Sequence, residues 1–148
     1  MKSPFLTSLS IILFLQQISL AAAVAQNGSQ VIKIACAQTK AIDLCISVIK
    51  SDSRSAGGDV RVFSIIVLDK ALSEADGLDK RCPEAYKKLV GDAGDAIGKL
   101  KSKQLVPSVE DSIKNAINDV AGCRHGDGDD SLVITFLNIA KDVLKIVN

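Results

Sequence analysis

The residues best suited to chemistry in this 148-residue chain are its four cysteines, Cys36, Cys45, Cys82 and Cys123. Cys36 and Cys45 lie nine positions apart in one apolar segment, whereas Cys82 and Cys123 fall on two separate helical patterns. Four cysteines allow three pairings. The spacing favours Cys36–Cys45, which would close a short helical hairpin, together with Cys82–Cys123, which would tie two helices to each other.

The other candidate catalytic and metal-binding groups do not combine into a site. His125 is the only histidine, which excludes a zinc site with several histidine ligands, and the cysteines lack the paired short spacing of a zinc ribbon. A Ser-His-Asp triad would depend on His125 in a polar turn without a nucleophile elbow. Asp127, Asp129 and Asp130 do not form a calcium loop, since Asn138 rather than glutamate occupies the twelfth position. We therefore expect no enzyme, no metal and no cofactor.

The start of the chain has the layout of a secretory signal peptide. Lys2 precedes an apolar segment over residues 5–20, and Ala23-Val24-Ala25 follows as a cleavage site. We expect residues 1–25 to be removed, which leaves one domain over residues 26–148. A membrane anchor is the alternative, but serine and glutamine side chains interrupt the apolar segment.

The secretory prediction has consequences for modification and location. Behind a signal peptide, four cysteines indicate an oxidising compartment and disulfide bonds. Asn27 begins the sequence Asn-Gly-Ser and is a candidate N-glycosylation site. The expected location is the extracellular space or apoplast, with the vacuole as the alternative.

The charge of the mature chain bears on its partners. The signal peptide contains one lysine and no acid, so 17 basic side chains remain against 17 acidic ones. A neutral domain has no excess positive field for phosphates or anionic headgroups. We therefore expect neither nucleic acid nor a membrane as a partner, and the oligomeric state stays open.

Helical periodicity accounts for the rest of the mature chain. The expected elements are a hairpin over residues 31–50, a linker over 51–59 with Asp59 as N-cap, a helix from Val60, a helix from Lys80 with Pro83 in its first turn, a connector over 101–106, a helix after Pro107 with acids in its first turn, and a helix over 132–147.

The expected inward faces follow from the same spacing. The residues are Val60, Phe63, Ile66, Val67, Ala71 and Leu72; Cys82, Tyr86, Leu89, Val90, Ala93, Ile97 and Leu100; Val109, Ile113, Ala116, Ile117 and Val120; and Phe136, Leu137, Ala140, Val143, Leu144 and Val147. Gly91, Gly94 and Gly98 lie inside a helical pattern, so we interpret them as small residues that let a neighbouring helix approach rather than as a phosphate loop. No strand pair is indicated, and the expected fold is all-α.

The order of these features resembles that of the plant invertase and pectin methylesterase inhibitor family. The resemblance rests on the signal peptide, the hairpin CAQTKAIDLC, the linker SDSRSAGGD, the segment CPEAYKKLVGDAGDAI with its Cys82-x-x-x-Tyr86 spacing, a fourth cysteine that ends a helix, and the final LNIAKDVLKIV. It covers essentially the whole mature chain. It implies an up-down-up-down four-helix bundle preceded by a disulfide-closed hairpin, with the cysteines paired in sequential order.

The resemblance also implies a function, which is to bind a pectin methylesterase or an acid invertase and block its active-site cleft. In the invertase-inhibiting members a Pro-Lys-Phe segment enters the cleft. Val106, Pro107 and Ser108 take that place in this chain, and Glu110 and Asp111 follow. These five residues are the candidate target-binding site.

Two other functions stay open. The segment between Cys45 and Cys82 is short for the family, and the Pro-Lys-Phe motif is absent. The chain could therefore be a degenerate family member that binds another extracellular ligand without inhibition. A secreted lipid carrier is a more remote alternative, since small plant lipid-transfer proteins usually contain eight cysteines with an adjacent pair.

Overall fold

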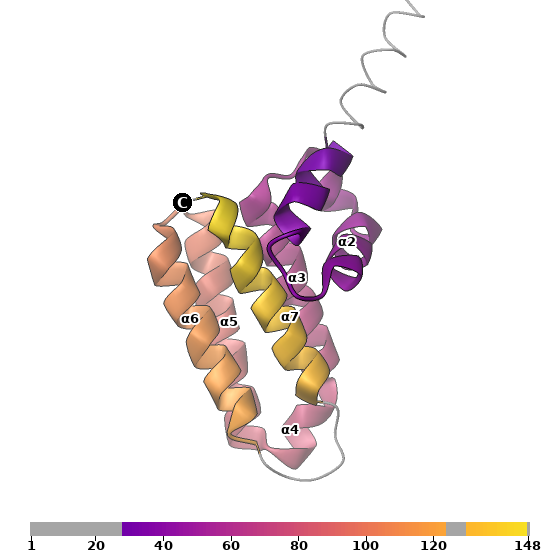
Figure 1. Cartoon of the computed structure of the whole chain (residues 1–148). Coiled ribbons are helices and arrows are strands. Elements are labelled where there is room, and N and C mark those ends of the chain that lie inside the picture. The colour runs from indigo at the N-terminus through magenta and orange to yellow at the C-terminus, as the bar shows by residue number, and fades with distance from the viewer. Residues whose placement is uncertain (1–27, 124–129, 148) are drawn as a thin grey trace, which may run out of the picture.

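The computed structural model describes residues 28–123 and 130–147, and within these ranges the chain is helical with no strand (Figure 1). The all-α prediction is therefore confirmed for the described residues. The predicted signal peptide, Asn27 and the segment with His125, Asp127 and Asp129 lie outside them.

The elements follow one another with short connections. They are a helical segment over residues 28–36, α2 (Ile42–Ser51), a 3₁₀ turn (Ser53–Gly57), α3 (Val60–Glu74), a 3₁₀ turn (Ala75–Gly77), α4 (Leu78–Arg81), α5 (Pro83–Lys101), α6 (Val106–Ala121), α7 (Asp130–Val143) and a 3₁₀ turn (Leu144–Val147). The helical segment 28–36 and α2 form the predicted hairpin.

Four long helices pack side by side below this hairpin (Figure 1). α5 packs against α6, α3 against α7, and further contacts join α6 to α7 and α3 to α5. Residues 102–105 connect α5 to α6, so these two helices run antiparallel. α3 and α7 are also antiparallel, since Ser64 near the start of α3 lies against Ala140 near the end of α7.

α3 is buried on nearly all sides. Six consecutive residues from Phe63 to Leu68 are buried, so the prediction of a single inward face is wrong for this helix. The reason is that α2, α5 and α7 all pack against α3. Ser64 lies in this apolar surrounding, and its hydroxyl donates to the Ala140 carbonyl at 2.9 Å, which satisfies the buried polar group.

Helix ends follow local chemistry. The carboxylate of Asp59 accepts hydrogen bonds from the backbone N–H groups of Arg61 and Val62, which confirms the predicted N-cap. The helix expected from Lys80 is instead divided at Cys82, whose φ of −141° and ψ of 71° are not helical. Cys82 precedes Pro83, and a residue before proline is sterically pushed out of the α region.

Two further predictions are wrong. A Cβ atom added to Gly91, Gly94 or Gly98 would meet no atom within 4 Å, so these glycines line an open face of α5 and do not bring a helix closer. Val90 and Val147 were expected to face inward but are exposed. On α5 the inward row is Leu89, Ala93, Ala96 and Leu100, and Val90 lies one residue, about 100°, around the helix from Leu89.

Both predicted disulfides are present. Cys36 and Cys45 are bridged with their Cα atoms 5.7 Å apart, and Cys82 and Cys123 are bridged at 6.0 Å. The first bridge is buried beside the turn of the hairpin, which it closes. The second joins the start of α5 to the end of α6, so it closes the end of that helix pair opposite the 102–105 connection.

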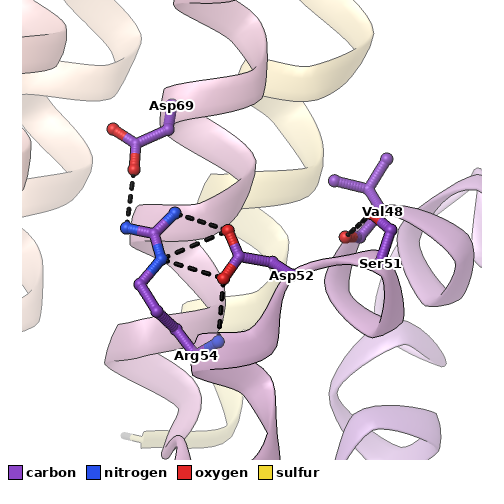
Figure 2. A network of polar contacts seen from close by, with 5 residues as sticks. All are labelled: Val48, Ser51, Asp52, Arg54 and Asp69. Atoms are coloured by element: carbon purple, nitrogen blue, oxygen red, sulfur yellow. Dashed lines mark hydrogen bonds and ion pairs between the residues drawn. The ribbon is translucent and has the colours of Figure 1, made fainter.

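A guanidinium group ties the linker to α3 (Figure 2). Arg54 donates to both carboxylate oxygens of Asp52 and, through Nη1, to Asp69 on α3 at 2.8 Å. Hydrogen bonds from the side chain and then the backbone N–H of Arg54 lower the pKa of Asp52 to about 2. The glycine-rich linker is therefore an ordered turn with a fixed position on the bundle.

The two disulfides should contribute unequally to stability. In the chain-entropy model, closing a loop of about 42 residues at Cys82–Cys123 stabilises by about 4 kcal/mol, against about 2.7 kcal/mol for about 10 residues at Cys36–Cys45. We expect the double variant Cys82→Ala, Cys123→Ala to lose more thermal stability than Cys36→Ala, Cys45→Ala. Circular dichroism melting of both oxidised variants measures this difference, and equal midpoint shifts would contradict it.

Candidate functional site

The connection between α5 and α6 carries the most exposed large apolar side chain of the described residues. Leu105 is 79% exposed and is the residue that immediately precedes α6. Pro107 is also exposed, in the first turn of that helix. Figure 1 shows this connection at the same end of the bundle as the end of α7. Leu105 and Pro107 therefore form an apolar projection, which we call the α5–α6 edge.

The structure separates the five predicted target-binding residues. Val106 is buried in the core, whereas Pro107 and Asp111 are exposed and Ser108 and Glu110 are half-buried. Val106 is therefore unavailable to a partner, and only the other four residues can contribute to a contact surface.

The predicted boundaries of this region are also wrong by a residue at each end. Lys101 belongs to α5, and α6 begins at Val106, because the Val106 side chain packs into the core and starts the inward row of the helix. The sequence predicts Glu110 and Asp111 in the first turn of this helix. Because α6 begins at Val106, both residues lie beyond its first turn.

Hydrogen bonds fix the α5–α6 edge in place. Arg61 on α3 donates through Nη1 to the Gln104 carbonyl at 2.9 Å. Lys99 on α5 donates to the Ser108 carbonyl at 3.2 Å, and the Ser108 hydroxyl donates to the Leu105 carbonyl at 2.8 Å. These three donors, on α3, α5 and α6, hold the backbone on both sides of Leu105, so its side chain projects from an ordered backbone.

A polar cluster lies directly below this edge, between α5 and α6. The Ser112 hydroxyl donates to Asp95 at 2.6 Å and accepts from the Lys99 ammonium at 2.9 Å, and Lys99 pairs with Asp95 at 2.7 Å. The hydrogen bonds from Lys99 and then Ser112 lower the pKa of Asp95.

Serine, lysine and aspartate together invite comparison with a nucleophilic site, but this geometry does not serve one. Ser112 is only 4% exposed, and its proton is directed to a carboxylate rather than to a free base. Lys99 forms an ion pair with that same carboxylate. The cluster instead links the two helices that present the α5–α6 edge.

A groove between α5 and α6, of about 360 Å³, contains a pair of facing acids. Asp92 on α5 and Asp119 on α6 line it, beside Gly91, Asn115 and Asn118. Burial, then a hydrogen bond to Asp119 and the charges of Asp119 and Asp95, raise the pKa of Asp92, and Lys99 acts in the opposite direction. Asp92 therefore holds its proton more tightly than an exposed aspartate does.

No metal centre or membrane span is found among the described residues. They contain no group of three or more histidine, cysteine, aspartate or glutamate side chains that could hold a metal ion. None of the helices in the described ranges is both long enough and apolar enough to cross a membrane.

Sequence reasoning missed several of these residues. Leu105 carried a usable signal, since it is an apolar residue that follows the polar run KSKQ. Asp95 and Lys99 are four residues apart on one predicted helix, which was a signal for their ion pair. The position of Ser112 beside them carried no signal, because it depends on the register between α5 and α6. The position of Asp119 opposite Asp92 carried none for the same reason.

Comparison with known proteins does not assign the chain to a family. No protein-family model matches the sequence, and a search of curated proteins found no match. The fold and the site define an all-α, disulfide-bonded protein with an ordered apolar edge, and the family remains a proposal.

The Asp92–Asp119 pair should make stability depend on pH. The folded-state pKa of Asp92 is raised above its ordinary value of 3.8, so the folded state binds the proton more tightly and stability is lost as the pH rises through that raised pKa. Asp92→Asn removes the repulsion and should stabilise the protein at neutral pH, with a smaller effect at acidic pH.

Urea unfolding of the wild type and Asp92→Asn at several pH values from acidic to neutral tests this expectation. Asp111→Asn is the matched control, because Asp111 is exposed and faces no second carboxyl group within residues 28–123 and 130–147 but forms an ion pair with Lys114. A stability gain of Asp92→Asn that does not grow with pH would contradict a raised pKa of Asp92 in the folded protein.

Proposed function

We propose that this chain is a secreted protein inhibitor of a carbohydrate-active enzyme, either a pectin methylesterase or an acid invertase, that acts by blocking the active-site cleft. The observation that carries the proposal is the α5–α6 edge, in which exposed Leu105 and Pro107 project from a backbone held by Arg61, Lys99 and Ser108. It is the same region in which invertase-inhibiting members of the resembled family place their cleft-binding segment.

The physical features of this edge suit inhibition. A backbone that is already ordered loses little conformational entropy when the side chains that it carries are buried in a partner. Proline and a large aliphatic side chain supply apolar area, and half-buried Glu110 and exposed Asp111 supply polar groups at the rim. Such a surface needs no catalytic group of its own.

Two disulfides support an oxidising, secretory-type environment. We propose the extracellular space, in a plant the apoplast, as the location, with residues 1–25 as the signal peptide and Asn27 as a glycosylation site. The expected partner is a protein enzyme rather than nucleic acid or a membrane.

A second candidate is a degenerate relative that binds another extracellular ligand without inhibiting an enzyme. The burial of Val106 favours this candidate. Val106 is the first of the three residues that take the place of the Pro-Lys-Phe segment, and a buried residue cannot contact a partner. The connection between α3 and α5 is also short, with only the four-residue helix α4 and a 3₁₀ turn. It belongs to the segment between Cys45 and Cys82 that is short for the resembled family.

An inhibition assay of the oxidised mature chain separates these functions. We expect it to slow either a plant pectin methylesterase or an acid invertase at mildly acidic pH. Leu105→Asp should weaken inhibition by about tenfold or more, as expected for a buried interface residue. Helical circular dichroism should not change, because Leu105 is exposed in the free protein.

The matched control is Val90→Asp, which changes an exposed apolar residue on the outer face of α5. A loss of inhibition with Val90→Asp alone would move the contact surface to that helix face. A second variant, Pro107→Ala with Glu110→Gln, tests the predicted site itself. If neither enzyme is slowed by an oxidised, helical chain, the inhibitor proposal fails and the degenerate-relative proposal replaces it.

A further inference from the structure

A groove lined by lysines lies between the turn of the hairpin and α7. Its volume is about 400 Å³. Lys40 lines it from the hairpin, Thr135, Asn138, Lys141 and Asp142 line it from α7, and Lys145 lines it from the 3₁₀ turn that follows α7. It shares no lining residue with the α5–α6 edge, so it is a separate feature of the surface.

The charges in this groove are not balanced. Lys145 pairs with Asp142 at 2.8 Å, and the hydrogen bond and charge of Asp142, with a smaller effect of Glu110 on α6, raise the pKa of Lys145. Lys141 contacts a neutral group, the Asn138 amide oxygen, at 3.1 Å, and forms no ion pair with a carboxylate in the described part of the chain. Among the described residues Lys40 forms no ion pair with a carboxylate. Two ammonium groups are therefore left without a compensating charge.

The groove is shaped in advance by bonds that do not involve the lysines. The Cys36–Cys45 disulfide closes the turn that carries Lys40, and the buried Thr39 hydroxyl donates to the Cys36 carbonyl at 2.9 Å. On the opposite wall, Thr135 donates to the Ser131 carbonyl and Asn138 to the Ile134 carbonyl. Both walls are thus ordered before any ligand arrives, which lowers the entropic cost of binding.

The neutral polar side chains keep some hydrogen-bonding capacity. The Asn138 amide uses one of its two N–H groups on Ile134, and the Thr135 hydroxyl oxygen can still accept. Buried Ile139 forms an apolar part of the lining. Ammonium donors beside amide and hydroxyl groups suit an anion that also carries hydroxyl or ether oxygens.

We propose that this groove binds a small polyanion, a molecule with two or more carboxylate or phosphate groups. Lys40 and Lys141 would each donate a charge-assisted hydrogen bond to a separate anionic group. A ligand with two negative charges matches the two uncompensated ammonium groups, whereas a single anion would leave one of them unmatched. This site is independent of the inhibitor proposal.

Isothermal titration calorimetry of the oxidised mature chain tests the site with two probes, citrate and inorganic pyrophosphate. Acetate serves as the singly charged control, and all titrations are made at one ionic strength of about 0.1 M, since screening changes such affinities. We expect saturable binding of one polyanion per chain and much weaker binding of acetate. Preference for citrate would indicate a carboxylate ligand, and preference for pyrophosphate would indicate a phosphate ligand.

Charge variants locate the binding. Lys40→Gln and Lys141→Gln should each weaken it roughly three- to tenfold, the range for a charge-assisted hydrogen bond at a partly exposed site. Lys114→Gln is the matched control, since Lys114 lies on α6 outside the groove. Asp142→Asn should strengthen binding because it removes the carboxylate of the groove and frees Lys145, while Asp111→Asn should not change it.

Two results would overturn the proposal. One is binding of citrate and pyrophosphate that is no tighter than binding of acetate. The other is an equal loss of affinity in Lys114→Gln and Lys141→Gln, which would show attraction to the whole surface instead of to the groove.

Discussion

The burial of α3 on nearly all sides is the constraint on which the other elements depend. A helix with six consecutive buried residues cannot be stable at a surface, so it requires neighbours around most of its circumference. α7 and α5 cover two sides, and the hairpin with α2 covers a third. The short apolar hairpin is therefore part of the core, and the Cys36–Cys45 bridge holds it there.

Polar contacts then specify the register in which the neighbouring elements pack. Hydrophobic packing is not directional, whereas a side-chain hydrogen bond between two elements favours one register between them. Ser64 does this between α3 and α7, Arg54 between the linker and α3, and the cluster of Asp95, Lys99 and Ser112 between α5 and α6. Each contact joins segments that apolar burial alone would allow to slide.

The two candidate surfaces use this rigidity in different ways. The α5–α6 edge presents apolar side chains from a backbone fixed by Arg61 and Lys99, as a protein-binding surface requires. The lysine groove presents unbalanced positive charge between a disulfide-closed turn and α7. The mature chain expected from the sequence is neutral. The positive charge of the groove therefore comes from the local placement of a few lysines and cannot be inferred from the net charge.

The sequence by itself determined the helical fold, the N-cap at Asp59 and both disulfides, because periodicity, capping and loop closure are local or depend on spacing along the chain. The helix break at Cys82 was also predictable, because a residue before proline is disfavoured in the α region. The apolar spacing from Lys80 onward instead favoured a continuous helix. Only the tertiary structure decided that α3 is buried on several faces, that Val106 is unavailable, and that Asp92 faces Asp119. These facts depend on which helices become neighbours and in which register they pack. Apolar periodicity identifies the inward face of a helix, but it does not identify the helix against which that face packs.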